Sequence, residues 1–376
     1  MTADAPRVRF AHLPTPLEEM PRLRAALGPH CPRLLVKRDD ATGLGLGGNK
    51  TRKLEFLMGA AQAAGAGAVL TYGALQSNHA RQTAAAAAKL GLTCDLILFD
   101  MVAGRDPVYR VTGNPMLDRL FGARVHVVNA GDDFGAIRAR VMAAHESEGR
   151  RVYDVPTGGS NATGALGYAS AYAATTVSAF VQRAVDALTH FATWGRDEVA
   201  EHPAEFAVLL DLNPELLGQL DAMDIRARAI VHASSSGGTQ AGLVAGRLKA
   251  GRGPGVIGIN VAAADAGAMR ASVLALARET AARIGAPAPD VDDIDVRDGF
   301  LGAGYGQPTD AMREAVMLLA QMEGLLLDPV YSGKAMAALL HLVRAGTFAP
   351  DETVIFLHTG GAPALFAYPE IGTATK

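Results

Sequence analysis

The sequence predicts an α/β protein built from open, mostly parallel, twisted sheets with helices on both faces. Short apolar strands alternate with amphipathic helices over most of the 376 residues, and strands buried on both faces are typical of parallel sheets. A glycine-rich loop at 42–48 follows the first of these strands. Glycines let the backbone turn tightly and come close to a ligand. The length indicates two domains.

Composition narrows the class of protein further. Hydrophobic residues make up 49% and charged residues 19%, ample for sizeable cores. The net charge of −3 argues against a nucleic-acid partner, and Cys31 and Cys94 are too few for a disulfide framework or a cysteine metal site, so no metal is expected. The charged N-terminus is unlike a signal peptide, and the alanine runs are too short to span a bilayer. We therefore expect a cytoplasmic protein without a membrane partner.

The first alternating series predicts a small α/β domain at 50–160. A strand at Leu34–Arg38 leads into the glycine loop before it. Within the domain we expect helices at Lys53–Ala64, Asn78–Leu90, Pro115–Phe121 and Phe134–Glu148. Each helix precedes one strand, and in the same order the strands are expected at Ala68–Thr71, Asp95–Phe99, Val125–Val128 and Val152–Val155.

A second series completes a large domain formed by 1–49 and 161–376. We expect strands at Ala229–Ala233, Val256–Asn260, Leu325–Asp328 and Val354–His358, and helices from Gln240, at Ala311–Glu323 and at Gly333–Ala345. The interval 171–225 does not fit the alternation and has apolar residues at helical spacing from Val177 to Phe191. This helical insertion is either a core-facing stripe, a lid or a dimer contact.

Lys50 is a candidate nucleophile. It lies where the glycine loop leads into a helix, at the positive end of that helix and beside Arg52 and Lys53. Both features disfavour a charged amine, and an activated lysine is what Schiff-base chemistry with a carbonyl requires. The same residues also fit a surface loop with a solvated basic cluster.

Two further loops lie where a strand ends and a helix begins. Ser234–Thr239 offers backbone N–H groups and hydroxyls that suit a phosphate, although it lacks both the Walker lysine and the dinucleotide fingerprint. Ser77 and Asn78 are able to present side chains and amides to a carboxylate, or simply cap a helix. His79 either lines a pocket or faces solvent.

Two loop tyrosines and one strand end complete the candidates. Tyr305 and Tyr331 are each either packing residues or general acid–base groups. Thr359 follows the last strand at its carboxyl end, where open α/β sheets bind ligands.

Five motifs in this order resemble the pyridoxal-phosphate enzymes of the D-cysteine desulfhydrase, L-cysteate sulfo-lyase and 1-aminocyclopropane-1-carboxylate (ACC) deaminase group. They are Gly47–Glu55, Gln76–His79, Ser234–Thr239, Asp328–Lys334 and His358–Gly361. The resemblance covers nearly the whole chain except 171–225. It implies a tryptophan synthase β-type fold (fold type II), pyridoxal 5′-phosphate in the cleft between the domains, a small amino-acid substrate and a homodimer.

The resemblance also implies roles for individual residues. Lys50 would bind the cofactor covalently and shuttle the Cα proton. Asn78 would bond to the oxygen on the pyridine ring, Ser77 with its neighbours Asn78 and His79 would take the substrate carboxylate, and Tyr305 and Tyr331 would flank the substrate. The remaining cofactor contacts would come from Lys53, Ser234, Ser235, Ser236, Gly237, Gly238, Thr239, Ser332 and Thr359, with Ser332 facing the pyridine nitrogen.

Departures from the group's patterns favour some activities over others. Where this chain has Tyr331-Ser332, the pattern of the ACC deaminases resembles Tyr-Glu. A serine beside the pyridine nitrogen leaves the cofactor ring a weaker electron sink than a carboxylate does. Ser332 and His79 therefore argue against ACC deamination. Ser332 and the opening His12–Pro16 lean towards sulfo-lyases, while the serine-rich 234–238 loop departs from both remaining subfamilies.

We therefore expect α,β-elimination on D-cysteine or L-cysteate, giving pyruvate, ammonium and sulfide or sulfite. The alternatives are an ACC deaminase and a non-catalytic binding protein with the same fold.

Overall fold

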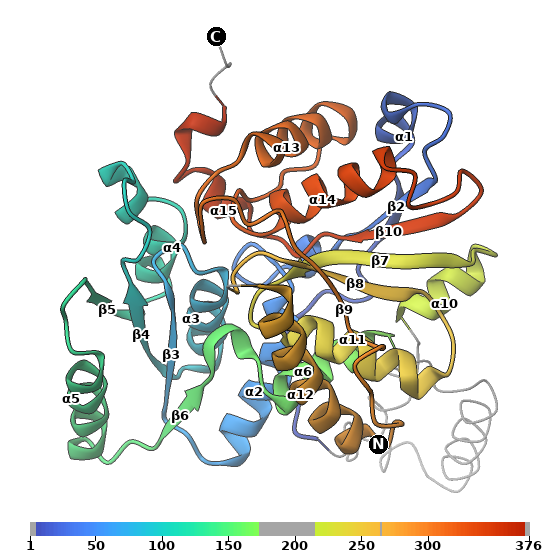
Figure 1. Cartoon of the computed structure of the whole chain (residues 1–376). Helices are drawn as coiled ribbons and strands as arrows, with labels where there is room; N and C mark the ends of the chain where they lie inside the picture. The colour runs from blue at the N-terminus through green and yellow to red at the C-terminus, as the bar shows by residue number, and fades with distance from the viewer. Residues whose placement is uncertain (1–4, 173–214, 264, 373–376) are drawn as a thin grey trace, which may run out of the picture.

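The computed structural model describes residues 5–172, 215–263 and 265–372. Their strands form two sheets (Figure 1). The strands are β1 (Leu17–Glu19), β2 (Arg33–Lys37), β3 (Ala68–Ala74), β4 (Thr93–Phe99), β5 (Arg124–Val128), β6 (Val152–Val155), β7 (Ala227–Ser234), β8 (Gly255–Asn260), β9 (Asp295–Arg297) and β10 (Thr353–Leu357). The six-stranded sheet has the order β1-β2-β10-β7-β8-β9, and the four-stranded sheet β5-β4-β3-β6. Only β1 pairs antiparallel among them.

Helices cover both sheets. They are α1 (Pro21–Leu27), α2 (Lys50–Ala63), α3 (Asn78–Leu90), α4 (Asn114–Leu120), α5 (Phe134–Ser147), α6 (Ala162–Tyr172), α10 (Glu215–Ala222), α11 (Gly238–Ala250), α12 (Ala266–Ile284), α13 (Asp310–Glu323), α14 (Ser332–Arg344) and α15 (Ala362–Leu365). Short 3₁₀ turns are η1 (Asp39–Thr42), η2 (Pro107–Arg110), η3 (Thr157–Gly159) and η4 (Pro369–Ile371). None of the helices in these described ranges is long and apolar enough to cross a membrane.

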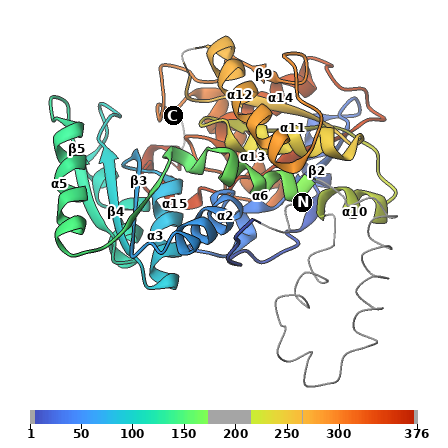
Figure 2. The same ribbon diagram turned by 90° about the horizontal axis from the view of Figure 1, so that it is seen from below.

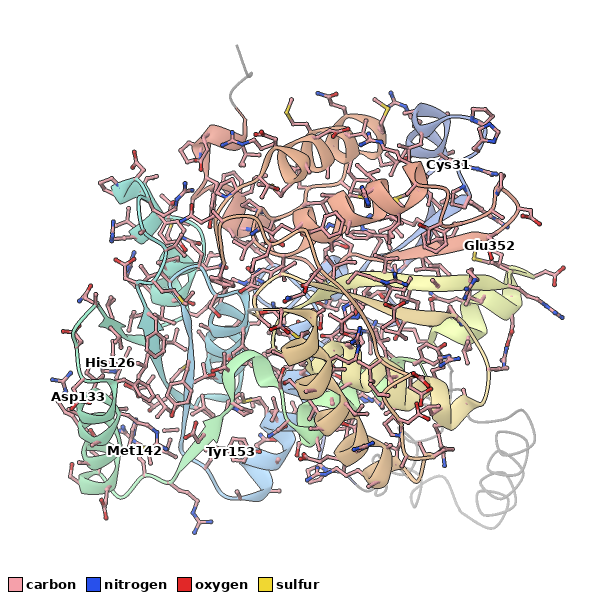
Figure 3. The ribbon with its side chains drawn as sticks, in the orientation of Figure 1. Cys31, His126, Asp133, Met142, Tyr153 and Glu352 are labelled. Carbon is pink, nitrogen blue, oxygen red and sulfur yellow. The ribbon has the colours of Figure 1, made fainter. Side chains whose placement is uncertain are left out.

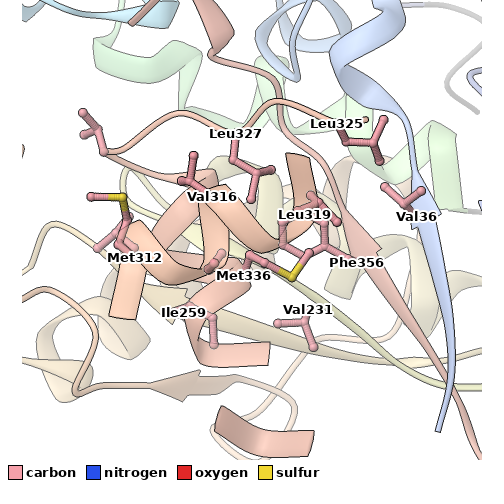
Figure 4. Close-up of a cluster of buried hydrophobic side chains, with 14 of the residues drawn as sticks. Val36, Val231, Ile259, Met312, Val316, Leu319, Leu325, Leu327, Met336 and Phe356 are labelled. Carbon is pink, nitrogen blue, oxygen red and sulfur yellow. The ribbon is translucent and has the colours of Figure 1, made fainter. Parts of the chain in front are cut away.

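The large sheet is buried on both faces because its strand residues alternate between two cores. In β10, Val354 and Phe356 belong to the core under α13 and α14, whereas Ile355 and Leu357 belong to the core under α6, α11 and α12. Figure 4 shows the first of these cores, in which strand residues meet residues of α13, of α14 and of the loop between these two helices. Its labelled members are Val36, Val231, Ile259, Met312, Val316, Leu319, Leu325, Leu327, Met336 and Phe356.

The small sheet lies beside the large one as a second lobe (Figures 1 and 2). Helix α3 packs on one face of β3 and β4, while Leu70, Ile97 and Val141 form a core between the other face and α5. His126 and Met142 lie in this lobe, and Cys31 and Glu352 lie at the opposite end of the molecule (Figure 3). The two sheets leave room for a site between them.

Most predicted elements agree with the structure within a few residues. Helix α3 has the predicted bounds, whereas α2 begins at Lys50 rather than at Lys53. The strand predicted at Leu325–Asp328 is wrong. The backbone of this apolar segment hydrogen-bonds to side chains and not to a neighbouring strand. Leu326 O is 3.1 Å from His358 Nε2, and Asp328 N donates to Ser332 Oγ at 2.9 Å.

The predicted insertion at 171–225 falls mostly outside the described residues. Its apolar stripe from Val177 to Phe191 is entirely outside them. The residues described at the C-terminal end of this interval form α10, which buries Leu216, Leu217 and Leu220 in the core of the large sheet. The domain boundaries, 1–49 with 161–376 against 50–160, stay a prediction.

Candidate active site

A cavity of about 290 Å³ lies at the carboxyl ends of strands from both sheets. Residues after β3 and β4 form one wall, and residues after β7 and β10 form the other. This is where parallel α/β sheets bind ligands. Candidate residues in its lining are Lys50, Ser77, Asn78, His79, Ser234, Ser235, Ser236, Gly237, Thr239, Tyr305, Tyr331 and Thr359. Of the predicted set, Lys53, Gly238 and Ser332 lie behind this lining.

Lys50 is the first residue of α2 and faces the cavity. Burial lowers the pKa of its amine to about 8, and only the charge of Asp328 opposes this shift. Its Nζ has no hydrogen-bond partner in residues 5–172, 215–263 and 265–372. An unbonded amine with a lowered pKa is suited to nucleophilic and acid–base chemistry.

The predicted reason for this lowered pKa needs correction. Arg52 does not act on Lys50 as a free charge, because it forms buried ion pairs with Asp39 (2.8 Å) and Glu215 (2.6 Å). Lys37 joins the same network through Glu215 at 2.7 Å. Arg52 is therefore neutralised, and burial rather than neighbouring cations depresses the pKa of Lys50.

Lys53 forms a corner of the site that lacks negative charge. Its fully buried Nζ donates to Gly158 O and Ser160 Oγ, both at 3.1 Å. Burial, followed by the charge of Lys50, holds its pKa well below the usual range. In the described part of the chain no carboxylate pairs with this amine. A buried amine without a counter-ion suits an anionic ligand.

The Ser234–Thr239 loop meets Lys53 through Ser160. The Ser160 hydroxyl donates to Ser236 Oγ at 2.7 Å and accepts from Gly238 N at 3.3 Å. A side chain at 238 would not fit, because a Cβ there would lie 2.8 Å from Lys53 Nζ. Helix α11 begins at Gly238, so its N-terminal N–H groups face this corner. The loop and Lys53 thus bring hydrogen-bond donors to one corner of the site, and their role in holding a phosphate stays a prediction.

The Ser77–His79 segment caps a helix and also lies at the cavity, whereas its role in binding a carboxylate stays a prediction. Ser77 caps α3 by accepting from Ala80 N at 3.1 Å, and it also lines the cavity. His79 is buried, with Nε2 2.8 Å from Thr71 Oγ1. The Thr71 hydroxyl donates to Val155 O at 2.9 Å, so His79 Nε2 is the protonated nitrogen. Nδ1 is left as a buried acceptor without a partner in the described ranges.

Tyr305 and Tyr331 form a hydroxyl pair at the cavity. Their oxygens are hydrogen-bonded, and their rings meet edge to face with centroids 5.8 Å apart. Burial raises the pKa of both phenols, so they stay neutral. The Tyr305 loop is held by Lys334, which donates to Leu301 O at 2.6 Å and Gly304 O at 3.1 Å.

The Ser332 hydroxyl is hydrogen-bonded to Asp328, and Ser332 does not line the cavity. Its hydroxyl donates to Asp328 Oδ2 at 2.6 Å and accepts from Asp328 N at 2.9 Å. Asp328 also accepts backbone N–H bonds from Val330, Tyr331 and Ser332, at 2.7–2.9 Å. The role of Ser332 beside the pyridine nitrogen stays a prediction.

Sequence reasoning missed Asp328, Ser160 and Asn114 as functional residues. Asp328 is a buried carboxylate whose charge opposes the lowering of the pKa of both Lys50 and Lys334. A signal for Ser160 was present: 157–160 is a run of small residues between a strand and a helix, like 234–239. Asn114 gave none, because its partner Asn78 is 36 residues away.

The comparisons with known proteins define the class. The model of the family described as "Pyridoxal-phosphate dependent enzyme" matches residues 8–192 and 198–360, and the chain belongs to this family. Relatives named D-cysteine desulfhydrase, from Salmonella typhimurium and Salmonella schwarzengrund, are each 39% identical over 363 residues, or 96% of both chains. A solved structure described as an ACC deaminase homologue matches with a TM-score of 0.74 and 31% identity, over 98% of this chain and 96% of the other.

These findings confirm the resemblance, the fold class, the enzyme class and pyridoxal phosphate as the cofactor. The cavity fits that group. Lys53 is a buried amine that lacks a counter-ion, the 234–239 loop offers donors beside it, and Lys50 offers an unbonded amine to an aldehyde. No group of three or more histidine, cysteine or acidic side chains in the described ranges is able to hold a metal ion.

Proposed function

We propose that this protein is a carbon–sulfur lyase that eliminates sulfide from D-cysteine and yields pyruvate and ammonium. The observation that carries the proposal is the unbonded Lys50 amine, which shares one cavity with Asn78 and the neutral pair Tyr305–Tyr331. The relatives named D-cysteine desulfhydrase support the substrate, since the similarity extends over 96% of both chains.

Binding follows from the charges around the cavity. Lys53 and the 234–239 loop would hold the cofactor phosphate, and Lys50 would attach to the aldehyde. Asn78 would bond to the ring oxygen, with Ser332 and Thr359 near the ring. When bound, pyridoxal phosphate supplies a sink for the electron pair released at Cα. Ser77 and the free backbone N–H groups at the N-terminus of α3, that of His79 included, would take the substrate carboxylate.

Proton movements fall to Lys50 and the tyrosine pair. Once the substrate amine has displaced Lys50 from the aldehyde, the freed Lys50 amine, with its pKa lowered to about 8, would take the proton from Cα. The C–S bond then breaks, and its electron pair leaves on sulfur. Tyr305 or Tyr331, both neutral, gives a proton to the departing sulfur and regains it from solvent. The released enamine takes up water to give pyruvate and ammonium.

ACC deamination is the second candidate, supported by the solved structure described as an ACC deaminase homologue. Ser332 weighs against it. Its hydroxyl is hydrogen-bonded to Asp328, and a serine at this position does not supply the carboxylate that would make the ring a strong electron sink.

Product release from several substrates tests the proposal. Purified, cofactor-loaded protein would be given D-cysteine, L-cysteine, L-cysteate and ACC separately, and keto acid, sulfide and sulfite would be measured. We expect pyruvate with sulfide from D-cysteine. Pyruvate with sulfite from L-cysteate alone would make the protein a sulfo-lyase, and 2-oxobutyrate from ACC alone a deaminase. No product from any of them would favour the non-catalytic alternative.

We also propose a homodimer formed through an apolar patch. A side chain at Gly45 would touch Phe121, and one at Gly113 would touch Pro363 O, so the glycine loop, α4 and α15 are neighbours. The exposed apolar side chains on these three segments are Leu46, Met116, Leu120 and Phe366. Exposed apolar clusters of this kind mark protein interfaces.

Light scattering tests the homodimer. The wild-type protein is expected at twice the chain mass of 39.0 kDa, and the double variant Leu120→Glu, Phe366→Glu at the chain mass. Val291→Glu, an exposed apolar residue outside these segments, serves as the control. A wild-type monomer would refute the dimer. The cytoplasmic location expected from the sequence stays a prediction that cell fractionation would test.

A further inference from the structure

Two buried asparagines meet beside the cavity. Asn114, the first residue of α4, is fully buried. Its Nδ2 donates to Gln76 O at 2.9 Å and to Asn78 Oδ1 at 2.9 Å. Asn78 itself lines the cavity.

This pair fixes the direction of the Asn78 amide. Gln76 O is a backbone carbonyl that only accepts, so the Asn114 atom facing it is the nitrogen. An amide nitrogen has two N–H donors and no acceptor site, so the Asn78 atom facing Asn114 is the oxygen. Asn78 Nδ2 therefore points away from Asn114, towards Gly361, where a Cβ would lie only 2.7 Å from it.

The direction of the Asn114 side chain is itself fixed by a second amide. Gln76 Nε2 donates to two backbone carbonyls, Tyr109 O at 2.6 Å and Thr112 O at 3.0 Å. Gln76 Oε1 consequently faces Asn114 and accepts from its backbone N at 3.0 Å. The carbonyls of Tyr109 and Thr112 thus fix the direction of the Gln76 amide. Gln76 in turn anchors Asn114, and Asn114 fixes the direction of the Asn78 amide.

This arrangement leaves one polar atom without a partner. Asn114 Oδ1 is buried, and no described residue bonds to it. Buried polar atoms without partners are rare because losing water destabilises them. The Asn114 amide thus makes both of its donor contacts through Nδ2, while its oxygen accepts from no described residue.

We propose that Asn114 is a positioning residue that holds the Asn78 amide so that Nδ2 donates to the ring oxygen of the bound cofactor. This inference rests on the proposed function, because it needs pyridoxal phosphate in the cavity. A donor at that oxygen stabilises its ionised form, whereas an acceptor favours the protonated form. The ionised form absorbs visible light, so the spectrum of the bound cofactor reports the direction of the Asn78 amide.

Asn114→Asp is the test variant, since it replaces the donating NH₂ with an acceptor of the same size. A carboxylate there repels Gln76 O and Asn78 Oδ1, so the Asn78 amide turns and presents Oδ1 to the cofactor. We expect the visible band of the cofactor-loaded variant to lose intensity to a shorter-wavelength band, as in the direct comparison variant Asn78→Asp. Asn114→Ala, which leaves Asn78 free to turn, should show a smaller change of the same kind.

Asp118→Asn is the matched control, because it replaces a carboxylate with an amide, the reverse of Asn114→Asp. Asp118 lies one turn further along α4, and its side chain has no hydrogen bond in the described ranges. Its spectrum should equal that of the wild type. Circular dichroism and cofactor content per chain separate misfolding from a spectral change.

The outcomes test the positioning role of Asn114 separately from the proposed function of the protein. An unchanged band in folded, cofactor-loaded Asn114→Asp would overturn the role of Asn114. If that variant does not fold, an unchanged band in Asn114→Ala would overturn it instead. A wild-type protein that gains no visible band with pyridoxal phosphate would overturn the proposed function itself.

Discussion

Lys50 and Arg52 stand two residues apart at the start of α2, yet their surroundings are opposite. Arg52 is buried among carboxylates and bonds to Asp39 and Glu215. Lys50 faces the cavity with no bonded partner in the described residues, and burial lowers its pKa to about 8. Positions two apart on a helix are rotated by roughly 200°, so they face different sides. Cations that adjoin in sequence therefore need not act on one another.

Lys53 sharpens the same comparison. It follows Arg52 directly and is equally buried, but its partners are a carbonyl and a hydroxyl. On one side of the start of α2, the charge of Arg52 is neutralised by an ion-pair network. On the other side, Lys50 and Lys53 lie in a site where no carboxylate is bonded to either amine in the described residues. We expect variants on the two sides to have different kinds of effect.

The largest effect is expected for Lys50→Ala. Loss of the amine that we propose attaches the cofactor and moves the Cα proton should lower turnover by about 10³-fold or more. It should also remove the visible absorbance of covalently bound cofactor while leaving the unfolding midpoint nearly unchanged. Keto-acid release and an absorbance spectrum check this, and retained turnover would refute the role of Lys50.

Arg52→Met should act on stability instead. The loss of Arg52 leaves Asp39 as a buried charge without its ion-pair partner and Glu215 paired with Lys37 alone. It should reduce the free energy of unfolding by about 3–5 kcal/mol. The exposed pair Arg138–Asp154, at 2.7 Å, gives the control: Arg138→Met should change it by less than about 1 kcal/mol. Urea unfolding measures both. Equal effects would show that the buried network contributes no more than a surface pair.

Lys53→Met should weaken cofactor affinity without abolishing attachment. A hydrogen bond to a charged group contributes about 1.5–3 kcal/mol, which corresponds to roughly a 10–100-fold rise in the Kd of pyridoxal phosphate. Lys249→Met is the control, because Lys249 also bonds to a carbonyl but lies on the surface. Fluorescence titration of the apo-protein measures the Kd. A wild-type Kd in Lys53→Met would show that Lys53 does not hold the cofactor phosphate.

The last prediction concerns Asp118, a buried carboxyl outside this helix, and its effect depends on pH. Burial raises its pKa from 3.8 to about 8. Between these values the native state holds a proton that the unfolded chain has released, so stability falls as pH rises. Asp118→Asn lacks this titration and should be more stable than the wild type at pH 9, where Asp118 is a buried charge in the native state. The gain should shrink towards pH 5, which thermal unfolding across that range would show.

Local patterns made much of the fold predictable from sequence. The strands at β2, β4 and β10 are short apolar runs, and Ser77 is a recognisable helix cap. Helix α12 was not predicted, since much of its buried face is alanine and threonine, as at Ala277 and Thr280. Leu325–Asp328 has the apolarity of a strand but lacks a strand beside it.

The candidate site was predictable in its motifs but not in its electrostatics. Lys50, Ser77, Asn78 and Tyr331 all line the cavity. The partner that neutralises Arg52, Glu215, is 163 residues away, and no local pattern indicates such a pairing. The direction of a side chain such as Ser332 depends in the same way on the tertiary contacts around it.

The most direct test of this account is the pH dependence of cofactor attachment to the apo-protein. Only an unprotonated amine attacks an aldehyde, so the attachment rate should rise with pH and level off with a midpoint near the Lys50 pKa of about 8. The midpoint should be the same in Arg52→Met, because burial sets it. A midpoint near the ordinary lysine value of 10.5, or one that moves with Arg52, would contradict the account.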